Sequence, residues 1–199
     1  VIGAMILAFT RRSHDDLVVR SSVNIATLGY ALPGSVLAVG IMLTFASIDN
    51  VLLTMARLIG WQSPGQILTG SVFALVIAYV VRFLAVAYGP IDSGLSRIRA
   101  SIAEAARGLG SSPAATLWRI YLPLLRPGLF TAALLVLVDV MKEMPATMLL
   151  RPFGWDTLAV RIYEMTSEGE WERAALPAIT LILVGLIPVI VLVRRSSKH

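Results

Sequence analysis

Four runs of mostly apolar residues constrain this chain more than any other feature. They cover residues 23–46, 68–88, 128–150 and 176–193. A helix rises about 1.5 Å per residue, so about 20 residues match the roughly 30 Å of hydrocarbon in a bilayer. Residues 1–9 are apolar but too few to cross, and we interpret them as the end of a further span. The pattern predicts an all-α, polytopic transmembrane bundle.

The composition agrees with a membrane protein. Of the 199 residues, 57% are hydrophobic and 15% are charged, and the mean hydropathy is +0.80. A soluble domain is usually richer in charged residues. The net charge of +5 could suggest nucleic acid, but the basic residues lie at the ends of apolar runs and not along one face. We therefore expect one transmembrane domain over residues 1–199 that contacts the lipid bilayer and no nucleic acid.

The distribution of positive charge predicts an orientation. If residues 89–127 are cytoplasmic, the same side holds Arg11, Arg12, Arg20, Arg97, Arg99, Arg107, Arg119, Arg126, Arg194, Arg195 and Lys198. The opposite side holds only Arg57, Arg151, Arg161 and Arg173, with Lys142 near it inside a span. Lysine and arginine accumulate in cytoplasmic loops. We therefore expect residues 89–127 inside the cell and residues 151–175 outside.

Glycine and proline predict where the spans bend or end. Pro33-Gly34 should kink the span 23–46, and Gly89-Pro90 should close the span 68–88. Residues 48–66 are expected to form a loop with a short interfacial helix near 52–59. Trp61 suits a membrane boundary.

Residues 101–127 form a polar stretch between two apolar runs, and their pattern predicts two short helices. Gly108 and Gly110 should end the first helix, and Ser112 followed by Pro113 is typical of the start of a second. The first helix carries apolar residues at helical spacing, namely Ile98, Ile102, Ala105, Ala106 and Leu109. The pattern alone also fits an ordinary surface helical hairpin.

The same stretch contains a motif made of Glu104, Ala105, Ala106, Gly110, Ile120, Leu122 and Pro123. In residue type and spacing this motif resembles the cytoplasmic EAA loop of permease subunits in ATP-binding-cassette importers. The resemblance implies that the loop docks on an ATPase subunit and transmits its motion to the spanning helices. It implies that Glu104 faces basic groups of the ATPase, that Ala105 and Ala106 allow the ATPase to approach closely, and that Gly110 permits the bend. It also implies that Ile120, Leu122 and Pro123 attach the second helix to the membrane bundle.

Sequence signals of catalysis are missing. The chain has no cysteine, only two histidines, and no Gly-x4-Gly-Lys-Ser/Thr stretch that would hold ATP phosphates. We therefore expect no enzyme activity, no catalytic residue, no cofactor and no metal site in this chain. The resemblance implies a bacterial inner membrane protein whose partners are a separate ATPase, a periplasmic substrate-binding protein and a second permease half, in the same chain or another.

Charged residues inside two apolar runs suggest a second site. Asp139, Lys142 and Glu143 lie in the run 128–150, with Asp139 near mid-membrane, and Arg82 lies in the run 68–88. Asp139 and Lys142 can pair at i,i+3, with Glu143 on the same side of the helix. Arg82 is expected to snorkel toward the headgroups or, alternatively, to pair with Asp139 or Glu143. The four residues either line a pathway or gate, or they form structural ion pairs.

A further resemblance concerns the cargo. Residues 139–154, followed by 155–159 and 173–178, resemble the second half of permeases that import ferric iron. This implies a C-terminal portion of such a permease. Related permeases for thiamine, sulfate, molybdate, phosphate and polyamines share the EAA loop, so these cargoes remain alternatives. An ion-driven secondary transporter is a further alternative, with Asp139 and Glu143 as coupling sites.

Overall fold

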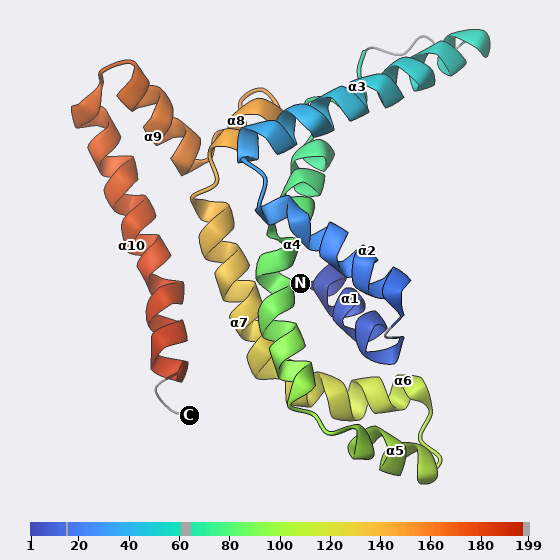
Figure 1. The fold of residues 1–199 in the computed structure, drawn as a ribbon. Helices are drawn as coiled ribbons and strands as arrows, with labels where there is room; N and C mark the ends of the chain where they lie inside the picture. Colours follow the sequence, from blue (N-terminus) through green and yellow to red (C-terminus); the bar gives the residue numbers. More distant parts are fainter. Residues whose placement is uncertain (15, 61–64, 197–199) are drawn as a thin grey trace.

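The computed structural model describes residues 1–14, 16–60 and 65–196, whose arrangement is shown in Figure 1. Trp61 lies outside the described residues. The described residues form helices and no strand, which confirms the all-α prediction. The helices are α1 (Ile2–Ser13), α2 (Leu17–Thr27), α3 (Gly34–Leu58), α4 (Val72–Ser96), α5 (Ala100–Gly108), α6 (Pro113–Thr116), α7 (Leu122–Met141), α8 (Pro145–Leu150), α9 (Leu158–Ser167) and α10 (Trp171–Ser196). A 3₁₀ turn η1 (Leu28–Tyr30) follows α2, and a π turn η2 (Leu117–Tyr121) joins α6 to α7.

Four helical stretches within the described residues are long and apolar enough to cross a membrane. They cover Gly34–Leu58, Val72–Ser96, Ala114–Met141 and Trp171–Arg194. Only 6–33% of the residues in their most apolar windows are buried within this chain, which is typical of surfaces that contact lipid or another membrane subunit. The polytopic prediction is confirmed, but the ends of the spans differ from those expected.

The first span begins later than the apolar run predicted. The expected span 23–46 is wrong because the chain is interrupted at Pro33, between η1 and α3. Proline is compatible with the start of a helix but not with its interior hydrogen bonds. From Gly34, α3 then continues to Leu58, so most of the expected loop over 48–66 is helical.

Prolines in the other spans do not end them. Helix α4 runs through Pro90 to Ser96, although Gly89-Pro90 was expected to close it. Helix α7 contains Pro127 and continues from the π turn η2, so this span begins at Ala114 and not at residue 128. A proline removes one helical hydrogen bond. Neighbouring helices and local π turns can compensate for that loss within a membrane bundle.

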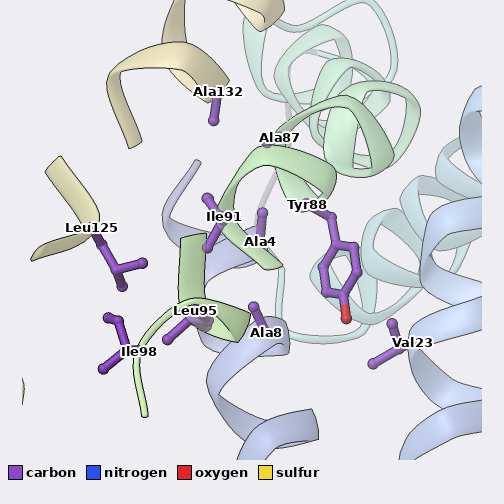
Figure 2. Close-up of a cluster of buried hydrophobic side chains, with 10 residues drawn as sticks. All are labelled: Ala4, Ala8, Val23, Ala87, Tyr88, Ile91, Leu95, Ile98, Leu125 and Ala132. Atoms are coloured by element: carbon purple, nitrogen blue, oxygen red, sulfur yellow. The ribbon is translucent and has the colours of Figure 1, made fainter. Parts of the chain in front are cut away.

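Helix α4 is the centre of the bundle. It packs most extensively against α7 and also contacts α1, α2 and α3. A Cβ atom placed on Gly128 of α7 would lie 2.9 Å from the carbonyl oxygen of Pro90, so only glycine permits this approach. Small residues commonly bring membrane helices together in this way. The buried cluster along these contacts, drawn in Figure 2, consists of Ala4, Ala8, Val23, Ala87, Tyr88, Ile91, Leu95, Ile98, Leu125 and Ala132.

A buried aspartate on α3 holds the connection to α4. The side chain of Asp49 is completely buried, and its two oxygens accept hydrogen bonds of 2.8–3.2 Å from the backbone N–H groups of Ile67, Leu68 and Thr69. Several N–H donors compensate a buried carboxylate for its lost hydration. Asp49 was expected in a loop, but it lies on a helix and orders the segment that follows.

The basic segments gather at one end of the bundle. The side chain of Arg12, at the end of α1, donates hydrogen bonds to the carbonyl oxygens of Leu95 and Ile98 at the end of α4. Helices α5 and α6 project beyond this end, and the described end of α10 lies at the same end of the bundle (Figure 1). This arrangement agrees with the grouping of arginines from which the orientation was predicted.

Candidate functional site

Residues 97–121, which we call the elbow, form two short helices joined by a bend (Figure 1). Gly110 has a φ of +79°, and the N–H of Ser111 donates to the carbonyl of Ala106 at 2.9 Å. Glycine adopts this left-handed conformation without strain, and the bond is typical of a glycine-capped helix end. Ser112 caps α6, because its Oγ accepts from the N–H of Ala115 at 3.2 Å. The predicted helix, bend and second helix are therefore present, but the second helix continues through η2 into α7.

The motif residues of the elbow differ in exposure. Glu104, Ala105 and Gly110 are exposed, whereas Ala106 is buried within this chain. Within this chain, Ala105 is therefore the alanine of the motif that is accessible, and a role of Ala106 in close approach stays a prediction.

The second elbow helix is attached mainly by residues that the motif did not indicate. Ile120 and Leu122 are half-buried, and Pro123 is exposed. The ring of Tyr121 meets Phe9 of α1 edge-on, with ring centroids 5.2 Å apart, and Leu125 is buried. Aromatic pairs of this geometry stabilise packing beyond the area that they bury. These two contacts tie the elbow to the bundle.

Large apolar side chains on the elbow are exposed. Leu109 is 88% exposed and Trp118 is 68% exposed. Ile102, which belongs to the apolar stripe predicted for the first helix, is also exposed. Large exposed apolar residues on a projecting element are typical of protein–protein contacts. The elbow therefore presents both an apolar surface and the carboxylate of Glu104.

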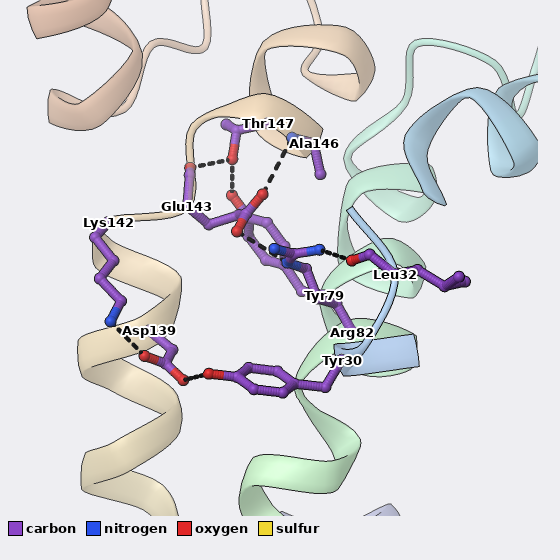
Figure 3. A network of polar contacts seen from close by, with 9 residues as sticks. All are labelled: Tyr30, Leu32, Tyr79, Arg82, Asp139, Lys142, Glu143, Ala146 and Thr147. Atoms are coloured by element: carbon purple, nitrogen blue, oxygen red, sulfur yellow. Dashed lines mark hydrogen bonds and ion pairs between the residues drawn. The ribbon is translucent and has the colours of Figure 1, made fainter. Parts of the chain in front are cut away.

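Two interruptions of the helices meet beside the middle of α4, as Figure 3 shows. One separates η1 from α3, and the other separates α7 from α8. Arg82 of α4 contacts both interruptions. Its Nε lies 2.9 Å from Oε2 of Glu143, and its Nη1 donates to the carbonyl of Leu32 at 2.8 Å. Irregular backbone at membrane depth needs such internal partners, because no lipid group can supply them.

Glu143 is buried and has several partners. Its Oε1 accepts from the N–H of Ala146 at 3.2 Å, at the start of α8. The hydroxyl of Thr147 donates to the main-chain carbonyl of Glu143 at 2.6 Å and lies 2.6 Å from the hydroxyl of Tyr79. Buried charges are stable when they are paired and hydrogen-bonded in this way. Glu143 therefore connects α8 to α4.

Asp139 and Lys142 form a separate ion pair at the end of α7. Nζ of Lys142 lies 2.8 Å from Oδ1 of Asp139, as the i,i+3 spacing predicted. The hydroxyl of Tyr30 makes a longer contact of 3.5 Å with Oδ2 of Asp139. The side chain of Lys142 is 66% exposed, whereas that of Asp139 is 14% exposed.

Three expectations for this region are wrong. The expected span 128–150 is interrupted, because α7 ends at Met141 and α8 begins at Pro145. Glu143 therefore lies beyond the end of α7, off the helix face of Asp139, and its side chain pairs with Arg82 of α4. Arg82 does not snorkel toward the headgroups, because Glu143 supplies a buried counter-charge. The second alternative for Arg82, an ion pair with Glu143, is the one observed.

Further members of this group were not predicted from the sequence. We call the whole group the polar network, consisting of Tyr30, Leu32, Tyr79, Arg82, Asp139, Lys142, Glu143 and Thr147. Tyr79 and Thr147 are polar residues inside apolar runs, and that was the available signal, since such residues usually find partners. Among the described residues, no group of three or more histidines, aspartates or glutamates is arranged to hold a metal ion.

Gly34 gives a first testable prediction. A Cβ atom at this position would lie 2.7 Å from Oε1 of Glu143 and 3.3 Å from Cζ of Arg82. We expect Gly34→Ala to displace the ion pair and to reduce the free energy of unfolding by about 1–3 kcal/mol. Gly40→Ala on the same helix is the control, because no atom lies within 4 Å of its added Cβ. Equal thermal unfolding midpoints for the two purified variants would contradict this prediction.

Comparison with known proteins identifies the family. The family model described as "Binding-protein-dependent transport system inner membrane component" matches residues 1–197. A permease from Salmonella typhimurium named for 2-aminoethylphosphonate transport, PhnV, is 32% identical over 153 residues, which are 77% of this chain and 58% of that protein. The Fe(3+)-transport system permease protein FbpB 2 of Haemophilus influenzae is 31% identical over 126 residues, which are 63% of this chain and 25% of that protein.

The family model extends over the spans, the elbow and the polar network, because it matches nearly the whole chain. The chain spans 58% of the length of the first relative and a quarter of the second. Both relatives are named as transport permeases and not as enzymes. The chain therefore belongs to the binding-protein-dependent inner-membrane components, the permeases of ATP-binding-cassette importers, and is a multi-pass inner membrane protein.

Proposed function

We propose that this chain forms part of the translocation path for ferric iron in an ATP-driven importer, and that the elbow couples the path to a separate ATPase subunit. In this proposal the elbow end of the bundle is cytoplasmic. A second permease half, in the same polypeptide or another, completes the path.

The observation that carries the proposal is the exposed elbow. It combines the apolar side chains of Leu109 and Trp118 with the exposed carboxylate of Glu104. Its second helix is continuous with the α7 span, and α7 packs on α4 at the centre of the bundle. A force applied to the elbow would therefore act directly on a membrane helix. The absence of a phosphate-binding Gly-x4-Gly-Lys-Ser/Thr stretch from this sequence supports a separate source of ATP hydrolysis.

The opposite end of the bundle offers a surface for a periplasmic binding protein. Arg151 lies between α8 and α9 and pairs with Asp156 and with Glu164, the latter at 2.6 Å. These pairs connect the start of the segment 151–175 to α9. The aromatic side chains of Phe153 and Trp155 are exposed on it. Exposed aromatic residues on an ordered segment are typical of protein interfaces.

Two cargoes are supported by specific relatives. Ferric iron is supported by the resemblance of residues 139–154 to the second half of ferric iron permeases, and by the relatives named for ferric transport. 2-Aminoethylphosphonate is the second candidate, because the relative named for it shares a larger part of this chain at similar identity. Uptake of radiolabelled ferric iron and of 2-aminoethylphosphonate should be compared in cells whose only importer for each compound contains this chain. Uptake of 2-aminoethylphosphonate alone would reject the iron assignment without affecting the coupling mechanism.

The coupling role can be tested with introduced cysteines, because this chain has none of its own. We expect Leu109→Cys in the assembled importer to form a cross-link to the ATPase subunit with a short bifunctional reagent. Trp155→Cys is the control, because it is also exposed but lies between α8 and α9. Absence of a cross-link from position 109, or equal cross-linking from position 155, would contradict the proposed docking.

A further inference from the structure

A cavity of about 530 Å³ lies at the elbow end of the bundle, between α1, α2 and α4. Its lining residues are Arg11, Arg12, Arg20, Asp92, Leu95 and Ser96. Among the described residues, three arginines and one aspartate thus line the same cavity. We call this site the basic cavity. Its volume falls within the range of about 300–1,000 Å³ that is usual for ligand pockets.

Two of the arginines are held in place by the bundle. Arg12 donates to the carbonyls of Leu95 and Ile98, and its guanidinium lies 5.4 Å from the centre of the Tyr121 ring. Arg11 donates to the hydroxyl of Tyr88 at 3.1 Å, and that hydroxyl donates to Oδ1 of Asp92 at 3.2 Å. Tyr88, Leu95 and Ile98 belong to the buried cluster in Figure 2. A ligand would therefore meet guanidinium groups that are already ordered, which lowers the entropy cost of binding.

The chemistry of the basic cavity favours a phosphate group. Guanidinium groups bind phosphate oxygens through two parallel hydrogen bonds, and several of them around one site balance its negative charge. We propose that the basic cavity binds a phosphate-bearing anion at the cytoplasmic surface of the membrane. Basic pockets between membrane helices on the cytoplasmic side bind anionic headgroups in this manner. The proposal does not depend on the cargo or on docking of the ATPase.

Neighbouring residues of α2 suit a ligand with an apolar tail. Leu17 and Val18, which precede Arg20 on this helix, are 80% and 75% exposed. Ile25 of α2 and Leu28, the first residue of η1, are also exposed and lie at helical spacing from them. An anionic phospholipid would place its phosphate in the cavity and its acyl chains along this face. A soluble phosphate compound would use the cavity alone.

The test compares lipid and phosphate on the intact importer. The complex is placed in nanodiscs of phosphatidylcholine with or without phosphatidylglycerol, and native mass spectrometry counts the phosphatidylglycerol molecules that remain bound. We expect Arg11→Gln/Arg20→Gln to weaken retention about tenfold or more, because charge-assisted hydrogen bonds are lost. Arg12 is left unchanged because it also holds the end of α4. Arg126→Gln is the control, since it removes an exposed arginine near the elbow that does not line the cavity.

A second measurement separates the two sources of phosphate. Inorganic phosphate is titrated into the complex in pure phosphatidylcholine nanodiscs while the unfolding temperature is recorded. If phosphate raises the unfolding temperature and the effect depends on Arg11 and Arg20, the cavity binds a soluble phosphate compound. If phosphatidylglycerol is selectively retained, the cavity binds a lipid headgroup. The single variant Arg20→Gln, whose side chain is exposed, accompanies the double variant in case the latter folds poorly. If the original chain and these variants show no difference with either probe, the proposal is overturned.

Discussion

Replacing Glu143 with leucine is expected to lower the free energy of unfolding by about 3–5 kcal/mol. The change leaves Arg82 of α4 without its buried counter-charge and removes the acceptor of the Ala146 N–H. An unpaired buried charge is far more costly than an absent ion pair. Thermal or denaturant unfolding of the purified protein in detergent would measure the loss. Glu170→Leu is the matched control, because its partner Arg173 is 67% exposed and such pairs contribute less than about 1 kcal/mol.

The double variant Arg82→Leu/Glu143→Leu should recover much of this stability. Two apolar side chains of similar volume can replace a buried ion pair at little cost, since no uncompensated charge remains. A double variant no more stable than Glu143→Leu alone would show that the two residues do not stabilise the fold as a pair. The comparison requires all three variants, because only a double-mutant cycle isolates the interaction between two residues.

The same double variant distinguishes the two roles left open for the polar network. A structural ion pair predicts a folded double variant that still transports its cargo. A pathway or gate predicts a folded variant whose uptake is lost, because charged groups at membrane depth usually serve an aqueous path when they are not structural. Uptake in proteoliposomes, measured beside the unfolding midpoint, gives this answer directly.

The number of spans and the elbow were predictable because they depend on local patterns. Runs of apolar residues reveal membrane helices whatever their neighbours are. The bend at Gly110 and the cap at Ser112 are likewise set by residues within one turn. These elements carry their structural signal within a few adjacent residues.

The ends of the spans were not predictable from proline. Pro33 interrupts the chain, whereas Pro90 and Pro127 lie inside continuous helices. The surroundings of the two internal prolines differ from those of Pro33: the carbonyl of Pro90 closely approaches Gly128 of α7, and Pro127 lies on α7 shortly after the π turn η2. A single sequence does not indicate which proline has such a neighbour.

The two ion pairs of the polar network also differ in how far the local sequence predicts them. The pair of Asp139 and Lys142 follows from helical spacing and was predicted. The pair of Arg82 and Glu143 joins residues 61 positions apart, and it forms because two helix interruptions meet beside α4. Both residues were recognisable as candidates because they are charged residues in apolar runs. Whether Arg82 extends to the membrane surface or pairs with Glu143 depends on the tertiary structure, which the local sequence does not specify.

Changing Gly110 to proline is expected to reduce uptake at least tenfold while leaving the amount of inserted protein unchanged. Gly110 has a φ of +79°, whereas the proline ring fixes φ near −65°. The bend between α5 and α6 must then change direction, so that Glu104 and Leu109 are presented at another angle. Gly110→Ala should show a smaller loss, because a left-handed alanine costs about 1–2 kcal/mol and can retain the bend.

The readouts are cargo uptake and ATP hydrolysis by the assembled importer in proteoliposomes, with membrane insertion checked separately. Gly108→Ala is the control, because it lies in the same elbow, has no positive φ, and no atom lies within 4 Å of its added Cβ. Glu104→Lys tests the docking surface without bending the chain, and it should also uncouple hydrolysis from uptake. If the elbow couples the ATPase to the membrane helices, the loss of uptake should be smallest for Gly108→Ala, larger for Gly110→Ala and largest for Gly110→Pro. If Gly110→Pro and Glu104→Lys both transported normally, the elbow could not be the element that receives the ATPase.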